Sequence, residues 1–246
     1  MKKILAAAVL VMLLCIACIS SKTMGDASLL LEHGIALAAK EDYDTAISDF
    51  TEAIKLHPKF IAAYSQRGLA YANRGNYDKA IKDYSRVIRL DPNPAAVYTS
   101  RGNAYYNNGN YDKAIKDYSR VIKFYPDSTT GYYSRGNAYF NKGDYDKALA
   151  DFTRVISINP DSAIAYYNRG NVYYKKGDYV RAIADNTQVI KIYPDSAVAF
   201  TSRGTAYYNN GNYDLAVEDL NKALSIDPNS TVAKQNLEIV LKARGY

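Results

Sequence analysis

A pattern that returns every 34 residues constrains the fold of this chain more than any other feature of its sequence. An Arg-Gly pair recurs at this spacing, and so does a proline. The pairs begin at Arg67, Arg101, Arg135, Arg169 and Arg203, and the prolines are Pro58, Pro92, Pro126, Pro160, Pro194 and Pro228. A period of about 20 to 50 residues is typical of a solenoid, in which each unit buries its apolar face against its neighbours.

Each unit is predicted to contain two helices. In the unit that begins at Ala95, two sets of residues are spaced i, i+4 and i+7, as on one face of a helix. The sets are Tyr98, Gly102 and Tyr105, and Ala114, Tyr118 and Val121. Between them, Gly109 can adopt the left-handed conformation that ends a helix. Pro126 ends the second helix, because proline fits poorly in a helix interior. The unit is therefore a helix hairpin with a tight turn.

An Asp or Asn follows the turn in every unit and is expected to cap the second helix, which stabilises a helix by about 1 kcal/mol. These residues are Asp42, Asn76, Asn110, Asp144, Asp178 and Asn212.

The unit resembles the tetratricopeptide repeat (TPR) family, position by position. Family positions 4, 8, 11, 20, 24, 27 and 32 are Tyr98, Gly102, Tyr105, Ala114, Tyr118, Val121 and Pro126. Six units share this register and are numbered here repeats 1 to 6, covering 27–60, 61–94, 95–128, 129–162, 163–196 and 197–230. The resemblance implies an all-α fold, a right-handed superhelical solenoid of six TPR helix hairpins. Residues 231–246 are expected to form the C-terminal capping helix that a solenoid needs.

A glycine recurs at position 8, in the middle of each first helix, although glycine costs about 1 kcal/mol relative to alanine there. The six are Gly34, Gly68, Gly102, Gly136, Gly170 and Gly204. Such a recurrence indicates a close approach of two helices, at which a Cβ atom would collide.

Arginine at position 7 recurs together with aspartate at position 23. The arginines are those of the five Arg-Gly pairs, and the aspartates are Asp49, Asp83, Asp117, Asp151, Asp185 and Asp219. The arginines could form a basic ladder for a polyanion. Their recurrence beside aspartates favours structural ion pairs.

Repeat 5 departs from the pattern at position 24, where Asn186 replaces the Tyr, Phe or Leu of the other repeats. A buried amide without partners costs about 1–3 kcal/mol. Repeat 5 is therefore predicted to be a soft spot or a place where water enters, with a deliberate hinge as the alternative.

The first 18 residues are predicted to be a secretory signal peptide. A basic start is followed by the uncharged apolar stretch 4–19, which is shorter than the roughly 20 residues of a membrane span. Cys15-Ile16-Ala17-Cys18 resembles a bacterial lipobox, although Cys15 stands where leucine is usual. We predict lipidation at Cys18 and a tether at 19–26; an uncleaved anchor and ordinary cleavage nearby are the alternatives. The protein is then exported, and either periplasmic or membrane-anchored by its lipid.

No catalytic or metal-binding pattern is present. Cys15 and Cys18 lie in the apolar export segment without a second ligand pair, and His33 and His57 belong to no zinc or catalytic motif. We expect no enzyme activity, no cofactor and no metal. The net charge of +6 and pI near 9.0 could suggest nucleic acid. Basic residues alternate with acidic ones, however, and nucleic acid is not an expected partner.

The concave groove of the TPR family is lined by positions 2, 5, 9, 12 and 13 of the first helices. The resemblance assigns to the groove Thr99, Asn103, Tyr106, Tyr133, Asn137, Phe140, Tyr167, Asn171, Tyr174 and Tyr208. Asparagine side chains can hold an extended peptide backbone by paired donors and acceptors, and tyrosines give a large contact area. The alternative is that these aromatic rings only pack between adjacent first helices.

The expected function is a non-enzymatic protein–protein interaction scaffold of the bacterial cell envelope, with a peptide or protein partner in the groove. The sequence predicts no particular oligomeric state. Repeats 1 and 2 instead carry Ile35 and Leu69 at position 9 and alanines at position 12. A structural adaptor that self-associates through these repeats is therefore an alternative. A polyanion-binding protein is less favoured.

Overall fold

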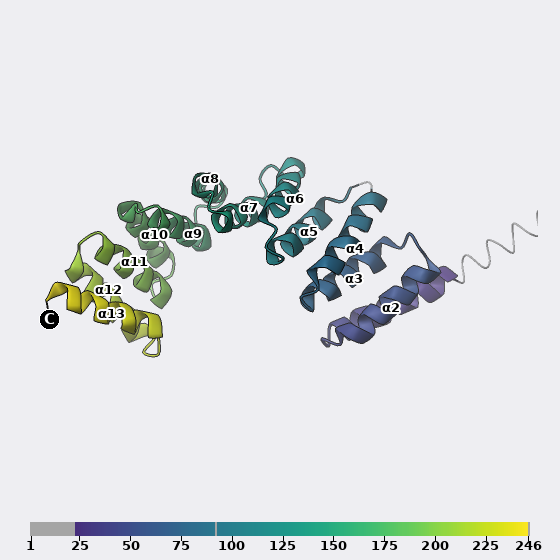
Figure 1. Ribbon diagram of the computed structural model, residues 1–246, viewed down its shortest axis with the longest axis horizontal. Coiled ribbons are helices and arrows are strands. Elements are labelled where there is room, and N and C mark those ends of the chain that lie inside the picture. Colours follow the sequence, from purple (N-terminus) through teal and green to yellow (C-terminus); the bar gives the residue numbers. More distant parts are fainter. Residues whose placement is uncertain (1–22, 92, 246) are drawn as a thin grey trace, which may run out of the picture. The chain divides into compact units, whose positions relative to one another are not determined.

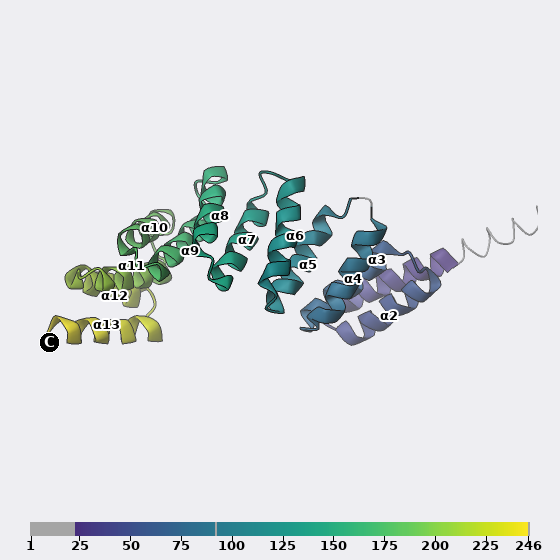
Figure 2. The same cartoon turned by 45° about the horizontal axis from the view of Figure 1, so that its top comes forward.

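The computed structural model of the chain describes residues 23–91 and 93–245, and these contain helices and turns but no strand. The predicted signal peptide and the lipidation site at Cys18 lie outside the described residues. Figures 1 and 2 show short helices that follow one another as antiparallel pairs. The prediction of an all-α fold built from repeated helix hairpins is confirmed.

The helices follow the predicted register closely. Residues 23–38 are helical and are followed by α2, Tyr43–Leu56. The remaining helices are α3 (Ile61–Asn73), α4 (Tyr77–Leu90), α5 (Ala95–Asn107), α6 (Tyr111–Phe124), α7 (Thr129–Lys142), α8 (Tyr145–Ile158), α9 (Ala163–Lys175), α10 (Tyr179–Ile192), α11 (Ala197–Asn209), α12 (Tyr213–Ile226) and α13 (Thr231–Arg244). From repeat 2 onward, every first helix begins at the first residue of its repeat. Residues 23–26, which were expected to lie in a tether, are already helical.

The chain divides into two compact units, with the division between Val121 and Ile122. Unit 1 contains repeats 1 and 2 and most of repeat 3. Unit 2 contains repeats 4 to 6 and α13.

In four hairpins, a glycine of the first helix lies against an aromatic ring of the second helix. A Cβ atom on Gly102 would lie 2.7 Å from Cε1 of Tyr118, and one on Gly68 would lie 2.9 Å from Cε1 of Tyr84. Gly34 meets Phe50, and Gly136 meets Phe152, in the same way. The predicted collision at position 8 is confirmed in repeats 1 to 4; the nearest atoms to a Cβ on Gly170 and Gly204 would be 3.2 and 3.1 Å away.

The turns and caps also follow the prediction, with two exceptions. Gly109 has a φ of 74°, in the left-handed region that favours glycine. The Asn110 side chain accepts a hydrogen bond from the Lys113 amide at 3.2 Å, and Asp42, Asn76 and Asp178 cap their helices similarly. Asp144 and Asn212 stand at the cap position without a capping bond from their side chains.

The last helix, α13, covers the end of unit 2. Its Ser230 side chain accepts a hydrogen bond from the Ala233 amide at 3.3 Å. Val240 is 1% exposed and packs in one cluster with Phe200 and Leu220, and Figure 1 shows α12 and α13 side by side. The predicted capping helix therefore buries the apolar side of the last hairpin. Across the described residues, no helix combines the length and the apolar character needed to cross a membrane.

Candidate functional site

The recurring arginines are occupied by ion pairs within their own repeats. Arg203 donates from Nε and Nη2 to the two carboxylate oxygens of Asp219, at 2.7 and 2.8 Å. Arg67, Arg101, Arg135 and Arg169 bind their aspartates in the same bidentate way. In repeat 1, His33 takes the place of arginine and lies 2.7 Å from Asp49. The prediction of structural ion pairs is confirmed.

Four of these arginines also bond to a side chain of the preceding repeat, namely Arg67, Arg101, Arg169 and Arg203. Nη1 of Arg203 donates to Oγ1 of Thr187, in the preceding second helix, at 3.1 Å. Its guanidinium lies between the rings of Phe200 and Tyr207, 5.5 and 5.8 Å from their centroids. The hydrogen bond to Asp219 raises the pKa of Arg203, against the opposing effect of burial. Arginine at this position is thus part of the scaffold.

In repeat 3, the predicted groove residues lie on α5. Asn103 is exposed, and its Oδ1 accepts a hydrogen bond from the Tyr118 hydroxyl at 2.8 Å. The Tyr106 ring packs edge-on against Tyr111, with centroids 5.5 Å apart. Thr99 is partly buried. A ring at position 24 can therefore reach from the second helix to the groove residue at position 9.

In unit 2, the predicted groove residues at positions 5 and 12 are partly buried and pack within the scaffold. The Tyr133 ring lies 6.0 Å from that of Phe152, and its hydroxyl accepts a hydrogen bond from Nδ2 of Asn168 at 3.0 Å. Tyr174 packs on Tyr179. Phe140 and Tyr208 pack in the same way on Tyr145 and Tyr213, and Tyr167 is partly buried as well. These rings have a packing role, and their assignment to a peptide groove stays a prediction.

Position 2 adds an exposed apolar row to the first helices of unit 2. Ile164, Val198 and Val232 are 58%, 59% and 56% exposed, and they lie on α9, α11 and α13. Position 9 lies two turns further along the same helix face. There Asn137, Asn171 and Thr205 are partly buried. Position 2 belongs to the predicted groove, but an exposed apolar row in unit 2 was not predicted.

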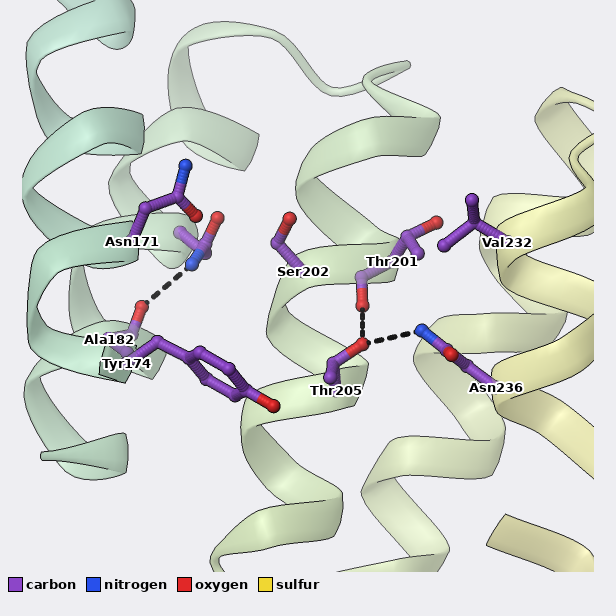
Figure 3. Close-up of a pocket in the computed structure, with 9 residues that line it drawn as sticks. Asn171, Tyr174, Ala182, Thr201, Ser202, Thr205, Val232 and Asn236 are labelled. Carbon is purple, nitrogen blue, oxygen red and sulfur yellow. Dashed lines mark hydrogen bonds between the residues drawn. The ribbon is translucent and has the colours of Figure 1, made fainter. Parts of the chain in front are cut away.

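A pocket of about 240 Å³ opens among α9, α10, α11 and α13 (Figure 3). Its polar lining includes Asn171, Tyr174, Thr201, Ser202, Thr205 and Asn236. Asn171 and Tyr174 are predicted groove residues, whereas Ser202 and Asn236 were not anticipated. Asn236 belongs to the capping helix, to which no binding role had been assigned.

The pocket wall is held by a short chain of hydrogen bonds. The Thr205 hydroxyl donates to the Thr201 carbonyl oxygen at 2.7 Å and accepts from Nδ2 of Asn236 at 2.9 Å (Figure 3). The Tyr174 hydroxyl accepts from Nδ2 of Asn209 at 3.0 Å. All the side chains that line this pocket are uncharged.

Asn186 forms the buried end of the pocket, which we call the Asn186 pocket. Its side chain is 2% exposed, and Nδ2 donates to the Ala182 carbonyl oxygen at 2.9 Å. Its Oδ1 atom is buried without a hydrogen-bond partner. The sequence anomaly at this position thus coincides with a cavity, and the entry of water there stays a prediction.

No group of three or more histidine, cysteine, aspartate or glutamate side chains that could hold a metal ion occurs within residues 23–91 and 93–245. The chemistry of the candidate site is therefore that of neutral hydrogen-bonding groups and apolar surface.

Family models match most of the repeat region. A model described as TPR repeat matches residues 34–75, 68–109, 102–143 and 136–177. A model described as tetratricopeptide repeat matches 163–196 and 197–230, which are repeats 5 and 6 as the sequence defines them.

Solved structures give the same result for the fold. MamA protein is 30% identical over 68% of this chain and 92% of its own, with a TM-score of 0.63. YrrB, described as a TPR protein with an unusual peptide-binding site, is 22% identical over 77% of this chain and 97% of its own, with a TM-score of 0.63. The C-terminal part of a TPR repeat-containing protein from Cytophaga hutchinsonii is 20% identical over 87% of this chain and 85% of its own, with a TM-score of 0.75. No curated protein sequence is a significant match.

Proposed function

Because the chain belongs to the tetratricopeptide repeat family, we propose that it is a non-catalytic scaffold that binds a segment of a partner protein along the first helices of unit 2. TPR folds are suited to protein–protein interaction, and the matching families are repeat families rather than enzyme families. The partner is expected to be a peptide segment or a protein surface, with no cofactor.

The observation that carries this proposal is the pairing of an apolar row with a polar row on consecutive helices. Ile164, Val198 and Val232 expose more than half of their side chains. Asn171 lies two turns after Ile164 on α9, and Asn137 occupies the same position 9 on α7. An asparagine can both donate to and accept from a peptide backbone. An extended segment could bury apolar side chains on the first row and bond its backbone to the second.

The test is a crosslinking pull-down from the native envelope with the Asn137→Ala/Asn171→Ala double variant. We choose these residues rather than Tyr133, because the Tyr133 ring and hydroxyl support the scaffold. The matched control is Lys191→Ala, an exposed change on the second helix α10. A partner lost only with the double variant supports the groove. A partner that both variants retain contradicts it.

We further propose that the protein acts in the bacterial cell envelope, anchored by a lipid on Cys18. This proposal rests on the uncharged apolar stretch 4–19 and the lipobox-like residues 15–18. Labelling cells with a palmitate analogue should mark the wild-type chain and leave the Cys18→Ser variant unmarked. Equal labelling of both, or recovery of the wild-type chain in the cytoplasmic fraction, would contradict the anchor.

Self-association through unit 1 is the second candidate. Ile35 and Leu69 occupy position 9 of successive first helices and are 41% and 48% exposed. Apolar side chains at this position favour a second copy of the chain over a polar peptide backbone. Light scattering should give a dimer or larger species that the Ile35→Ser/Leu69→Ser variant loses. A strict monomer for the wild-type chain would eliminate this candidate.

A further inference from the structure

Repeat 5 lacks the large apolar or aromatic side chain that the other repeats carry at position 24. In repeat 3, Tyr118 lies against Gly102 and its hydroxyl bonds to Asn103, so that its ring spans the hairpin from the second helix to the groove. Phe50, Tyr84 and Phe152 make the same contact with their glycines. In each of these hairpins, an aromatic ring of the chain itself fills the space between the two helices.

Asn186 is too short to fill this space. Its amide lies near Gly170, where an added Cβ would be 3.2 Å from Nδ2, and it bonds to Ala182 in its own helix. Asn171 corresponds to Asn103 of repeat 3, and it lines the pocket together with Asn186. The Asn186 pocket therefore lies between the same two positions that the Tyr118 ring bridges in repeat 3.

The uncharged lining of the pocket and its buried acceptor restrict which kinds of chemical group can bind there. Nδ2 of Asn186 is already used by Ala182, which leaves Oδ1 as a buried acceptor that lacks a donor. A buried acceptor without a partner favours a ligand that can donate a hydrogen bond. The lining is uncharged and includes apolar surface from Ala182, Val232 and the Tyr174 ring. A charged group would lose its hydration there without a counter-charge.

We propose that the Asn186 pocket receives a tyrosine side chain of the bound partner segment, whose hydroxyl donates a hydrogen bond to Oδ1 of Asn186. The partner then supplies the ring that the chain supplies for itself in repeat 3. The inference rests on the proposed groove function and adds to it a specificity for tyrosine at one place, beside repeat 6 and the capping helix. A phenylalanine would fill the space but leave the acceptor unpaired.

The pocket can be tested without the unknown partner by using p-cresol, the side-chain analogue of tyrosine. The full-length protein is titrated with p-cresol, toluene or propionamide while NMR follows the side-chain amide signals of Asn186 and Asn171. We expect saturable shifts with p-cresol at an affinity at least about tenfold above that of toluene, because p-cresol can donate a hydrogen bond to the acceptor and toluene cannot. No saturable shift with p-cresol, or tighter binding of propionamide, would overturn the tyrosine assignment.

Three variants separate pocket filling from hydrogen bonding. Asn186→Phe introduces the residue that repeat 4 carries at this position and should abolish p-cresol binding. Asn186→Leu keeps the branched shape without the acceptor and should bring p-cresol and toluene within about threefold of each other. Lys191→Ala, an exposed change on α10 outside the pocket lining, should leave p-cresol binding unchanged. Circular dichroism checks that each variant is folded. Wild-type p-cresol affinity in Asn186→Phe would refute the proposal.

A random peptide library selected on the full-length protein then separates failure of the pocket from failure of the groove. Peptides that require Asn137 and Asn171, carry tyrosine at one position and lose at least about tenfold in affinity to Asn186→Phe support both proposals. Peptides that require Asn137 and Asn171 but have no tyrosine preference leave the groove standing and overturn the pocket. If no selected peptide requires Asn137 and Asn171, the groove proposal fails, while the p-cresol titration still decides the pocket by itself.

Discussion

At the scale of single residues, the glycines of the first helices are where packing is tightest. In Gly102→Ala, the new Cβ would lie 2.7 Å from Cε1 of Tyr118. Either the ring or the helix must move, and such overpacking costs about 1–3 kcal/mol. Gly170→Ala is the matched control, since its nearest neighbour is Nδ2 of Asn186 at 3.2 Å and alanine gains helix propensity of about 1 kcal/mol.

Urea denaturation followed by circular dichroism should therefore give a lower midpoint for Gly102→Ala and a nearly unchanged one for Gly170→Ala. Equal losses for the two variants would mean that the ring contact does not explain the glycine.

Buried tyrosine at position 24 makes the stability sensitive to alkaline pH. Burial of Tyr84 raises its pKa from 10.0 to about 12, so its neutral form is favoured in the folded chain. The contribution of Tyr84 to the free energy of unfolding is complete below pH 10. As the pH rises through 12, the chain loses this contribution, which amounts to about 2–3 kcal/mol. Tyr84→Phe, which places the repeat 1 residue in repeat 2, should show a smaller decline over this range. The measurement is the free energy of unfolding of the wild-type and Tyr84→Phe proteins at pH values from 9 to 12. If the two free energies decline in parallel, the prediction is wrong.

Contacts between residues that recur in the repeats could be predicted from the sequence. Contacts that depend on a neighbouring repeat or on a single unusual residue could not. Arg203 and Asp219 could be paired because both residue types return at a constant separation in repeats 2 to 6. The bond from Arg203 to Thr187 crosses between repeats, and the position of Thr187 also carries serine, so its role was not visible from residue type. Asn186 was recognised as an anomaly, but its cavity arises from where neighbouring side chains end in space.

At the scale of elements, the second helices differ in how they are capped. Asn110 accepts a hydrogen bond from the Lys113 amide, whereas Asn212 makes no capping bond and instead accepts from Nδ2 of Asn210 at 2.8 Å. Asn110→Ala should therefore cost about 1 kcal/mol and Asn212→Ala a few tenths. Thermal unfolding followed at 222 nm would measure the difference. A larger loss of stability in Asn212→Ala than in Asn110→Ala would contradict this. It would show that the place of the repeat in the solenoid affects stability more than the capping bond does.

Element boundaries were predictable where the repeat provides a register and failed where it does not. The helices α9 and α11 begin at Ala163 and Ala197, the first residues of their repeats. The first helix was expected to start at Ala27, yet residues 23–26 are helical. Ala27 is fully buried in a cluster with Ala53 and Ala63, and a preceding turn of helix supplies carbonyl acceptors for the amides that follow it. Residues 19–26 were interpreted as a tether because no earlier repeat fixes their role.

At the scale of the whole molecule, the local stability of a solenoid varies with the packing of each repeat. Its stability is approximately a sum of repeat and nearest-neighbour terms, so that a weak repeat can open locally. Repeat 5 lacks the ring at position 24 and buries an unpaired Oδ1 on Asn186, which costs about 1–3 kcal/mol. The amides of α10 should therefore exchange with deuterium faster than those of α8, the corresponding helix of repeat 4 in the same unit.

The Asn186→Phe variant connects this weakness with the proposed pocket. Phenylalanine removes the unpaired acceptor and restores the ring that Phe152 provides in repeat 4, so α10 should gain protection while α8 changes little. Partner peptides with tyrosine should protect α10 in the wild-type chain for the same reason, because they fill the same space from outside. If α10 is already as protected as α8 in the free wild-type protein, repeat 5 is not a soft spot. Asn186 would then cost the fold little, and the site would have no instability for a partner to relieve.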